Sequence, residues 1–241
     1  MATEKESIQM TNDINKFARL SIFAITSVLF TASVSADQSI IEFSPIKSYV
    51  KHGVINTAHS YGVTDKYIVV PGRGGIVSDF PLDLRSGISI EFSVKSSIDI
   101  TDKGWVQQLR LFLFEEQPIQ SLKGARKNGK YIQFTLLPET VQRPNYTKEK
   151  SNTVHSSGYP AIWESNNNYL APLKWNEITI SVLNENQITV LVNNKVALIY
   201  KGSHPLRAYL GIGQNYSKKF FIGKHISING QEKTIGLEFE Q

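Results

Sequence analysis

The sequence of 241 residues contains no cysteine. It therefore has no disulfide framework, no thiolate metal site and no cysteine nucleophile. The chain also has little excess of charge of one sign. It contains 26 Lys and Arg residues and 21 Asp and Glu residues, which gives a formal net charge of +5. Such a scattered excess does not indicate nucleic acid as a partner. With 41% hydrophobic and 20% charged residues, the composition is that of a globular protein.

Motifs of common metal and phosphate sites are missing as well. The five histidines form neither an H-x-H nor an H-E-x-x-H pattern, so no zinc site is predicted. No D-x-D-x-D-G calcium loop occurs in the chain. The glycine-rich segment 71–75 lacks the Lys-Ser/Thr of a phosphate-binding loop, and we interpret it as a turn between strands. We therefore expect neither a metal ion nor a cofactor.

The N-terminal segment has the pattern of a secretory signal. Lys16 and Arg19 precede an apolar stretch, residues 20–34, and the small residues V-S-A follow at positions 34–36. A basic region, an apolar region and a V-x-A site in this order predict cleavage after Ala36. The apolar stretch is shorter than the roughly 20 residues that a membrane span needs. We expect residues 1–36 to be a leader and signal peptide and the mature protein to be secreted or periplasmic; a retained membrane anchor is the alternative.

Beyond the signal, the chain shows the alternation that is typical of β-strands. Residues 87–95 (GISIEFSVK) place Ile, Ile, Phe and Val on one face and polar side chains on the other. Residues 177–183, 187–193 and 196–200 repeat the pattern, separated by short Asn-containing turns. This arrangement predicts an antiparallel meander whose apolar side chains face the core. Trp175, just before the meander, is expected to cap the edge of that core.

A second kind of strand is apolar on both faces. Residues 109–114 (LRLFLF) have this character, which is typical of a strand that is covered on both sides, and residues 131–137 are expected to pair with it. We expect further strands at residues 40–43, 67–70, 207–213, 224–228 and 234–239. The sequence therefore predicts a single all-β domain over residues 37–241, an antiparallel β-sandwich or jelly roll.

A loop-rich insertion at about residues 138–172 interrupts this pattern. It contains four prolines, a run of three asparagines and few apolar residues. A stretch of this length inside a compact domain is often functional, and a mobile insertion is the alternative. Its aromatic side chains either stack on sugar rings or pack the loop onto the sheet. They are Tyr146, Tyr159, Trp163 and Tyr169.

Residues 173–180 (LKWNEITI) lead into residues 188–194 (ITVLVNN), and residues 82–94 contain the strand ISIEFSV after an L-D-L segment and a glycine. These segments resemble the concanavalin A-like lectin/glucanase superfamily, which includes laminin-G-like domains. In that group a W-x-x-I/V-x-I strand leads into an I-x-V-x-V-N-G/N strand. The resemblance covers roughly residues 60–240 and implies a concanavalin A-like jelly roll. Members of the group bind glycans, cleave them or mediate protein contacts, so the resemblance implies a fold more than a function.

The residues give little support for an enzyme. Glycoside hydrolysis needs two carboxylates across a cleft, and the E-x-D-x-E strand of the glucanase branch is missing here. Some jelly-roll polysaccharide lyases use Arg, Gln, His and Tyr on a concave sheet, although the companion Q-x-H pair is missing in this chain. The alternative is a structural role, either as a buried polar pair or, for Arg110, as the partner of Glu91 or Glu116. The lyase-like candidates are Gln108, Arg110, Tyr209 and Gln214.

Two features favour binding. A basic hairpin tip would attract anionic glycans or lipid headgroups, or merely solubilise the turn; it consists of Lys123, Arg126, Lys127 and Lys130. The insertion aromatics, together with Arg110, are the candidate ligand-binding residues. The main hypothesis is an exported, lectin-like module that recognises a carbohydrate or cell-surface glycan, without nucleic acid and without stable membrane insertion after signal cleavage. A polysaccharide-cleaving enzyme and a protein-interaction domain are the alternatives.

Overall fold

The computed structural model describes residues 40–47, 61–85, 87–97, 108–118, 129–139, 151–160, 162–214 and 218–238. The predicted signal peptide lies outside these residues, as do Tyr146, Lys123, Arg126 and Lys127. The described strands belong to one compact unit, Ser39–Gln241. Within the described part, no helix is long and apolar enough to cross a membrane. All regular structure there is β-strand, which confirms the predicted all-β class.

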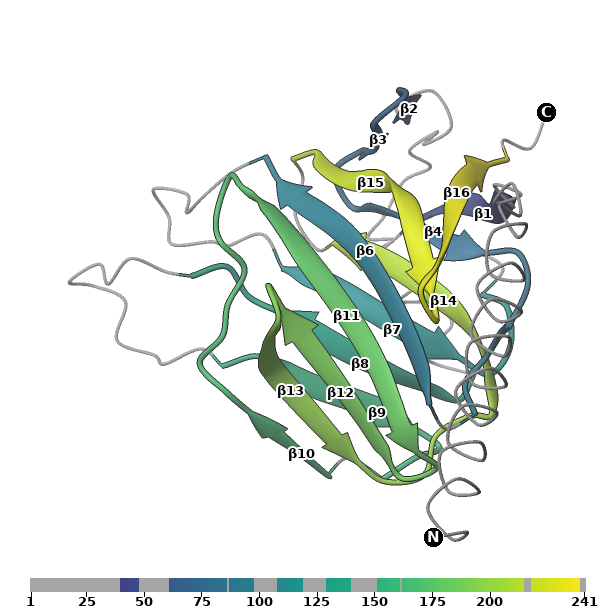
Figure 1. Ribbon diagram of the computed structural model, residues 1–241, viewed down its shortest axis with the longest axis vertical. Helices are drawn as coiled ribbons and strands as arrows, with labels where there is room; N and C mark the ends of the chain where they lie inside the picture. Colours follow the sequence, from purple (N-terminus) through teal and green to yellow (C-terminus); the bar gives the residue numbers. More distant parts are fainter. Residues whose placement is uncertain are drawn as a thin grey trace, which may run out of the picture. The chain divides into compact units, whose positions relative to one another are not determined.

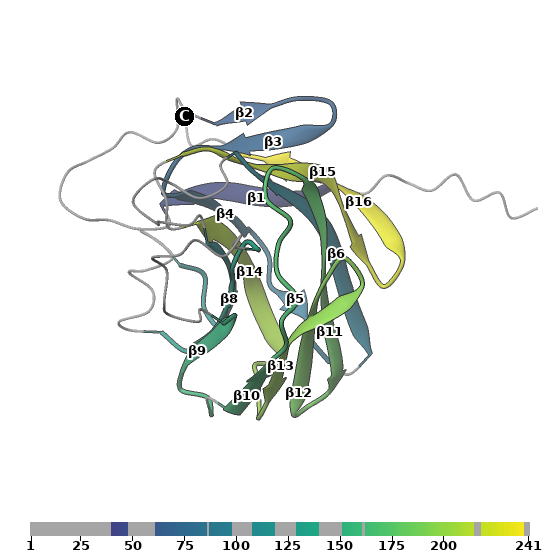
Figure 2. The ribbon, with the colours of Figure 1, turned by 90° about the vertical axis from the view of Figure 1, so that its left-hand side faces the viewer.

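One continuous sheet folds over on itself into two facing layers (Figures 1 and 2). The first layer contains, in spatial order, β10 (Ile162–Ser165), β13 (Lys195–Lys201), β12 (Gln187–Val192), β11 (Trp175–Asn184), β6 (Ile88–Ser96) and β15 (Phe220–Ile228). The short strands β3 (Tyr67–Val70) and β2 (Gly62–Val63) extend this layer from β15. We refer to it as the meander layer, because it contains the predicted meander.

The second layer, which we call the β7 layer, contains β4 (Gly74–Ser78), β14 (Arg207–Gln214), β7 (Leu109–Phe114), β8 (Tyr131–Leu136) and β9 (Thr153–Ser157). β5 (Leu82–Asp83) pairs with β14. β16 (Gln231–Leu237) and β1 (Ile40–Lys47) connect the two layers along the sheet. Neighbouring strands run antiparallel except for β1, which runs parallel to β16 with Ile41 opposite Ile235. The predicted antiparallel β-sandwich is therefore confirmed, with one parallel pair.

The meander forms as its alternation predicts. β11 and β12 pair with Ile180 opposite Val190, and the turn at residues 185–186 lies where the Asn-Glu-Asn segment indicated it. Asn193 and Asn194 form the next turn with φ values of 51° and 62°, a conformation that asparagine tolerates. The inward side chains of these strands are almost completely buried and form the core together with those of β6: Ile178, Ile180, Val182, Ile188, Val190 and Val192.

The strand that is apolar on both faces also lies where expected. β7 is flanked by β14 and β8, and both of its faces are buried apart from Arg110. Leu111 and Leu113 face the meander layer and join the main core. Phe112 and Phe114 face the other way and belong to a smaller apolar cluster. The β7 layer therefore has buried side chains on both of its faces.

Several short strands were not predicted from the sequence. β4 begins at Gly74, inside the glycine-rich segment that we interpreted as a turn, because only residues 72–73 form the turn itself. β9 and β10 lie inside the 138–172 insertion, which is therefore less loop-like than predicted. Both are five residues long or shorter, and so short a segment gives only a weak alternation signal.

Candidate functional site

The outward face of the β7 layer contains the polar residues that the enzyme hypothesis singled out. Arg110 lies opposite Thr135 on β8 and Gly213 on β14. Its guanidinium Nη2 donates a hydrogen bond to Gln108 Oε1 at 3.3 Å. Next to it, the amide of Gln133 donates to Thr135 Oγ1 at 2.7 Å. These contacts tie the polar side chains to one another along the strands.

The same face is mostly apolar and buried. Phe112 stacks on Phe114 with ring centroids 5.1 Å apart, and Phe114 lies 6.1 Å from the ring of Tyr131. The side chains of Ile46 and Val77 complete this cluster, and Phe112 is 1% exposed. Gln133 is also 1% exposed. The described residues therefore form a second small core here, whereas a catalytic cleft needs polar groups that substrate can reach.

The other lyase-like candidates lie on β14. Tyr209 packs against the small core formed by Phe112, Phe114 and Tyr131. Gln214, at the end of the strand, is buried and donates its side-chain amide to the carbonyl oxygens of Pro71 and Lys218. These contacts hold the end of β14 to neighbouring turns. Gln214 is therefore a structural residue in this fold.

Two of the aromatic residues predicted from the insertion turn inward. Trp163 on β10 and Tyr159 before it are half-buried and pack against the main core. Tyr169 is half-buried, and its hydroxyl donates to Asn167 Oδ1 at 3.2 Å. The packing of the insertion onto the sheet therefore accounts for Trp163 and Tyr159. Glycan binding by these residues and by Tyr146 stays a prediction.

The structure brings together two residues that the sequence placed in different features. Lys130, of the predicted basic tip, lies 3.3 Å from the carboxylate of Glu115 at the end of β7. Tyr159 lies near the same carboxylate. Burial, followed by the nearby negative charge of Glu115, raises the pKa of the Tyr159 hydroxyl to about 12. Glu115 thus offsets the charge of Lys130, which reduces the pull of this lysine on anionic ligands.

A different group of aromatic side chains lies on the solvent face of the meander layer. We call it the aromatic corner: Tyr67 from β3, Trp175 from β11 and Phe221 from β15. The ring of Tyr67 lies 6.2 Å from that of Trp175 and 5.5 Å from that of Phe221, in tilted and edge-on geometry respectively. Trp175 is 44% exposed, and the other two are partly exposed. The expectation that Trp175 caps the core was wrong, because Trp175 has the outward parity of Glu177 on β11.

A buried asparagine holds the turn that presents Trp175. Asn176 is 2% exposed. Its Oδ1 accepts a hydrogen bond from the Ala171 amide at 2.7 Å, and its Nδ2 donates to the carbonyl oxygens of Ala171 and Lys174 at 3.0 and 2.9 Å. Leu173 lies between Ala171 and Lys174 in the chain. Its φ is 59°, which is rare for a bulky residue, and its side chain is 50% exposed. The turn is therefore fixed by its contacts, and the three residues Leu173, Lys174 and Trp175 are held at the surface.

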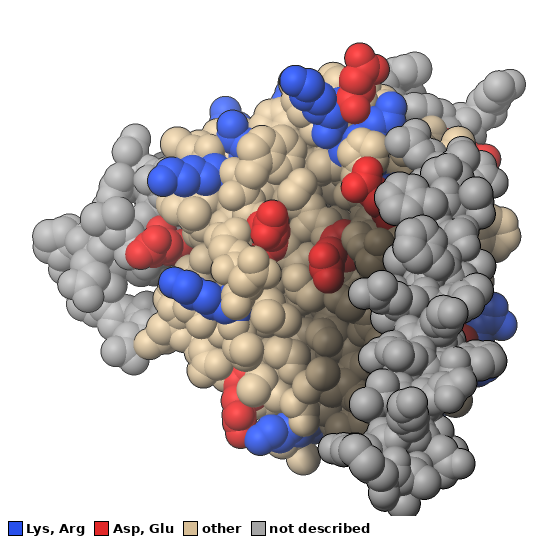
Figure 3. Space-filling model, in the orientation of Figure 1, with Lys and Arg blue, Asp and Glu red and all other residues tan. Residues whose placement is uncertain are grey.

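Lysine side chains surround the aromatic corner. Lys95 on β6 lies in register between Trp175 on one side and Phe221 on the other. Lys174 precedes Trp175 and Lys66 precedes Tyr67 in the chain, and the backbone amide of Lys224 donates a hydrogen bond to the carbonyl oxygen of Lys66 at 3.1 Å. Figure 3 looks onto this face of the molecule and shows basic side chains near the end where β11 begins, with acidic side chains closer to the middle of the sheet. The aromatic corner is thus an apolar surface with cationic neighbours.

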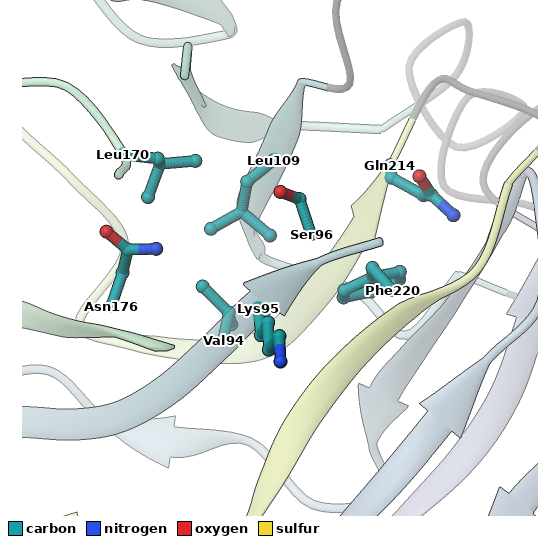
Figure 4. Close-up of a pocket in the computed structure, with 8 residues that line it drawn as sticks. All are labelled: Val94, Lys95, Ser96, Leu109, Leu170, Asn176, Gln214 and Phe220. Atoms are coloured by element: carbon teal, nitrogen blue, oxygen red, sulfur yellow. The ribbon is translucent and has the colours of Figure 1, made fainter. Parts of the chain in front are cut away.

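A small cavity lies beneath the same end of the sandwich (Figure 4). Val94, Leu109, Leu170 and Phe220 line it from different strands and from the insertion, and Asn176 and Gln214 border it. Its volume is about 20 Å³, which is room for one water molecule and not for a sugar ring.

The sequence contains one signal for this site, the alternation along two of its strands. Tyr67 and Phe221 each alternate with buried neighbours on their strands, so both point outward with Trp175. What the sequence does not show is that β3, β15, β6 and β11 are consecutive neighbours in one layer. Within the described residues, no group of three or more His, Asp or Glu side chains could hold a metal ion.

Comparison with known proteins finds similarity at the level of structure. No protein-family model matches the sequence, and no curated protein matches it. The chain is similar to the carbohydrate recognition domain of Emp46p in its potassium-bound form, with 14% identity and a TM-score of 0.49 over 78% of this chain and 88% of that chain. It is also similar to a protein of unknown function with a galectin-like fold from Bacillus subtilis, with 10% identity and a TM-score of 0.48 over 80% of this chain and 90% of that chain.

A third similar structure is the carbohydrate-binding module CBM66 from Bacillus subtilis, with 11% identity and a TM-score of 0.36 over 67% of this chain and 86% of that chain. One of these structures has a galectin-like fold, and the other two are a carbohydrate recognition domain and a carbohydrate-binding module. At such identities the likeness is one of fold and not of activity.

Proposed function

We propose that this protein is a glycan-binding module and that the aromatic corner is its binding surface. The observation that carries the proposal is Trp175, an indole ring that is 44% exposed on a polar sheet face and is held there by the Asn176 turn. Aromatic rings offer a rigid apolar surface at low entropic cost, and Tyr and Trp add a polar atom at the edge. The apolar C–H face of a sugar ring is the complementary partner for such a surface.

The surroundings of the aromatic corner support a sugar rather than an apolar protein partner. The outward face of β6 and β11 contains Ser93 close to it and Thr179, Ser181 and Ser89 further along the strands, all partly exposed. Hydroxyl groups of this kind exchange hydrogen bonds with sugar hydroxyls. An interface with a protein usually has a larger apolar centre, of several hundred Å². The combination of a few rings with many hydroxyl groups therefore favours a carbohydrate.

Export is part of the proposal. The basic, apolar and small-residue segments that end at Ala36 support it, since this order is typical of a cleaved signal. N-terminal sequencing of the protein purified from the exported fraction of a producing cell tests it. A mature N-terminus at Asp37 is the expected result, and a protein that keeps residues 1–36 would contradict cleavage.

The glycan test compares two variants of the same strand. Trp175→Ala removes the exposed indole. The control is Leu183→Ala, which removes an exposed side chain from the same face at the far end of β11, where Leu183 is 54% exposed. Polysaccharides are screened on an array, and each that binds is titrated by calorimetry with both variants. If Trp175 anchors the ligand, its loss should cost about 2 kcal/mol, roughly a 30-fold weaker affinity. Leu183→Ala should leave the affinity unchanged.

Two results would contradict the proposal. The first is an array on which no polysaccharide binds the natural protein. The second is binding that Trp175→Ala and Leu183→Ala leave equally strong, because the ligand would then lie elsewhere. If Trp163→Ala weakens the binding instead, the insertion residues predicted from the sequence are the site.

A further inference from the structure

We propose that the aromatic corner selects a negatively charged sugar unit, one that bears a carboxylate or a sulfate, and that Lys95 is the residue that recognises the charge. This inference rests on the proposed function, because it names the chemical class of the glycan that the same surface would bind.

The position of Lys95 is the first argument. It lies on β6 directly opposite Trp175 on one neighbouring strand and opposite Phe221 on the other. Side chains alternate between the two faces of β6, and Lys95 lies on the same face as Ser89, Glu91 and Ser93, which are partly or fully exposed. The side chain of Lys95 therefore points to solvent. A sugar ring that lies on Trp175 and Phe221 would therefore have this ammonium group beneath or beside it.

The other lysines are the second argument. Lys66, Lys174 and Lys224 come from three further segments around the same rings, and all are exposed or partly exposed. The ion pairs found within the described residues are Arg85–Asp83, Lys130–Glu115, Lys201–Glu164 and His225–Glu232, and none of them involves these three lysines or Lys95. Lysine charge that is not held in an ion pair with a described carboxylate is available for an anionic ligand.

Acidic residues near the aromatic corner are fewer. Asp65 precedes Lys66 in the chain, and Glu177 follows Trp175 on the same face of β11, opposite Ser93. Among the described residues, four lysines therefore lie near the rings against these two carboxylates, which gives this part of the surface a local positive potential. Potentials of this kind act over about 8 Å at physiological ionic strength, a distance comparable to the separation of the rings. The charge of the site therefore complements an acidic sugar, whereas the rings alone would accept a neutral one.

The test uses pairs of polysaccharides that differ only in charge. Polygalacturonate is compared with its fully methyl-esterified form, and heparin with its desulfated, carboxyl-reduced form, each titrated at low and at physiological salt. We expect at least one charged polymer to bind about tenfold more tightly than its neutralised partner, with a difference that shrinks as salt is added. Failure of both charged polymers to bind more tightly than their partners overturns the inference.

Variants assign the selectivity to a residue. Lys95→Gln should weaken the binding of the charged polymer about 5- to 10-fold and change the binding of the neutralised polymer less than twofold. Lys95→Arg should retain the preference, since it keeps the charge. Lys201→Gln, at the far end of β13 from the aromatic corner, is the control and should change neither affinity. Equal urea midpoints for the three variants ensure that each is folded.

The outcomes separate this inference from the proposed function. If neutral and charged polymers bind equally well and Trp175→Ala weakens both, the glycan-binding function stands and the charge selectivity is wrong. If Lys95→Gln leaves a strong charge preference intact, another group recognises the charge and the assignment to Lys95 is wrong. If neither polymer pair nor any other glycan binds, the proposed function fails together with the inference.

Discussion

The outward faces of the two layers differ in almost every respect. On β6 and β11 of the meander layer the outward side chains are mostly polar and at least partly exposed, with Leu183 at one end and aromatic rings at the other. On the β7 layer the outward side chains of Phe112, Phe114 and Tyr131 are at most 5% exposed and form a small core of their own. One face is therefore available for a ligand, whereas the other contributes to stability.

This difference follows from the sequence of one strand in each layer. In β6 every second residue is polar, as expected for a strand with one wet face. In β7 the phenylalanines occupy the alternate positions between the leucines, as expected for a strand that is covered on both sides. A lectin-like fold by itself does not say which face binds. Here the burial of the side chains favours the meander layer.

The largest expected effect tests whether the outward face of the β7 layer is a core. Phe112→Ala removes a ring that is 1% exposed and stacks on Phe114. Truncation of a buried phenylalanine leaves a cavity and typically costs 3–5 kcal/mol, so we expect a loss of about this size in the free energy of unfolding. Urea denaturation measures it. A loss below about 1 kcal/mol would show that this face is open to solvent.

The next effect compares the two faces of β11. Ile180 is completely buried between β6 and β12, and Ile180→Ala should cost about 2–5 kcal/mol. Thr179 lies beside it with its side chain on the wet face, and Thr179→Ala should cost less than about 1 kcal/mol. Urea unfolding of both variants measures the two losses in the free energy of unfolding. Equal losses would mean that both faces of the meander layer are covered and would remove the proposed binding surface.

A smaller effect is expected at the turn that presents Trp175. Asn176→Ala leaves the partly buried backbone groups of Ala171 and Lys174 without their side-chain partner. Such a loss typically costs 1–3 kcal/mol, and the turn should also hold the indole less firmly. We expect a lower urea midpoint together with weaker glycan binding, whereas Lys174→Ala, in the same turn, should leave the midpoint unchanged. A stable Asn176→Ala variant that binds normally would show that the turn does not position Trp175.

The smallest expected effect concerns the carboxyl group of Glu42, which belongs to neither of the two outward faces compared above. Partial desolvation, followed by the charges of Glu238 and Asp79, raises the pKa of Glu42 above its ordinary value of 4.5. The folded state therefore favours the protonated form, so the stability gained from this group is present below pH 4.5 and is lost as the pH rises through the raised pKa. Glu42→Gln should then raise the urea midpoint slightly at pH 7 and have no effect below about pH 4. A variant that is less stable at pH 7 would contradict the direction of the shift.

Particular residues show what the sequence can and cannot predict. The meander and its turns were predicted because Ile178, Ile180 and Val182 alternate strictly and asparagine tolerates the turn geometry. The aromatic corner was not predicted, because its rings come from residues 67, 175 and 221 and meet only through the neighbour order of four strands. The insertion aromatics Trp163 and Tyr159 were candidates from their polar surroundings in the sequence, yet in the fold they pack against the core.

Hydroxyl-radical footprinting, read by mass spectrometry, tests most directly which face binds. In the free protein, Trp175 and Leu183 should be oxidised readily, while Phe112, Phe114 and Tyr131 should be oxidised little. A polysaccharide identified on the array should then protect Trp175 and Tyr67 and leave Leu183 as reactive as before. Oxidation of Phe112 and Tyr131 in the free protein, followed by their protection in the complex, would place the ligand on the β7 layer and contradict the account.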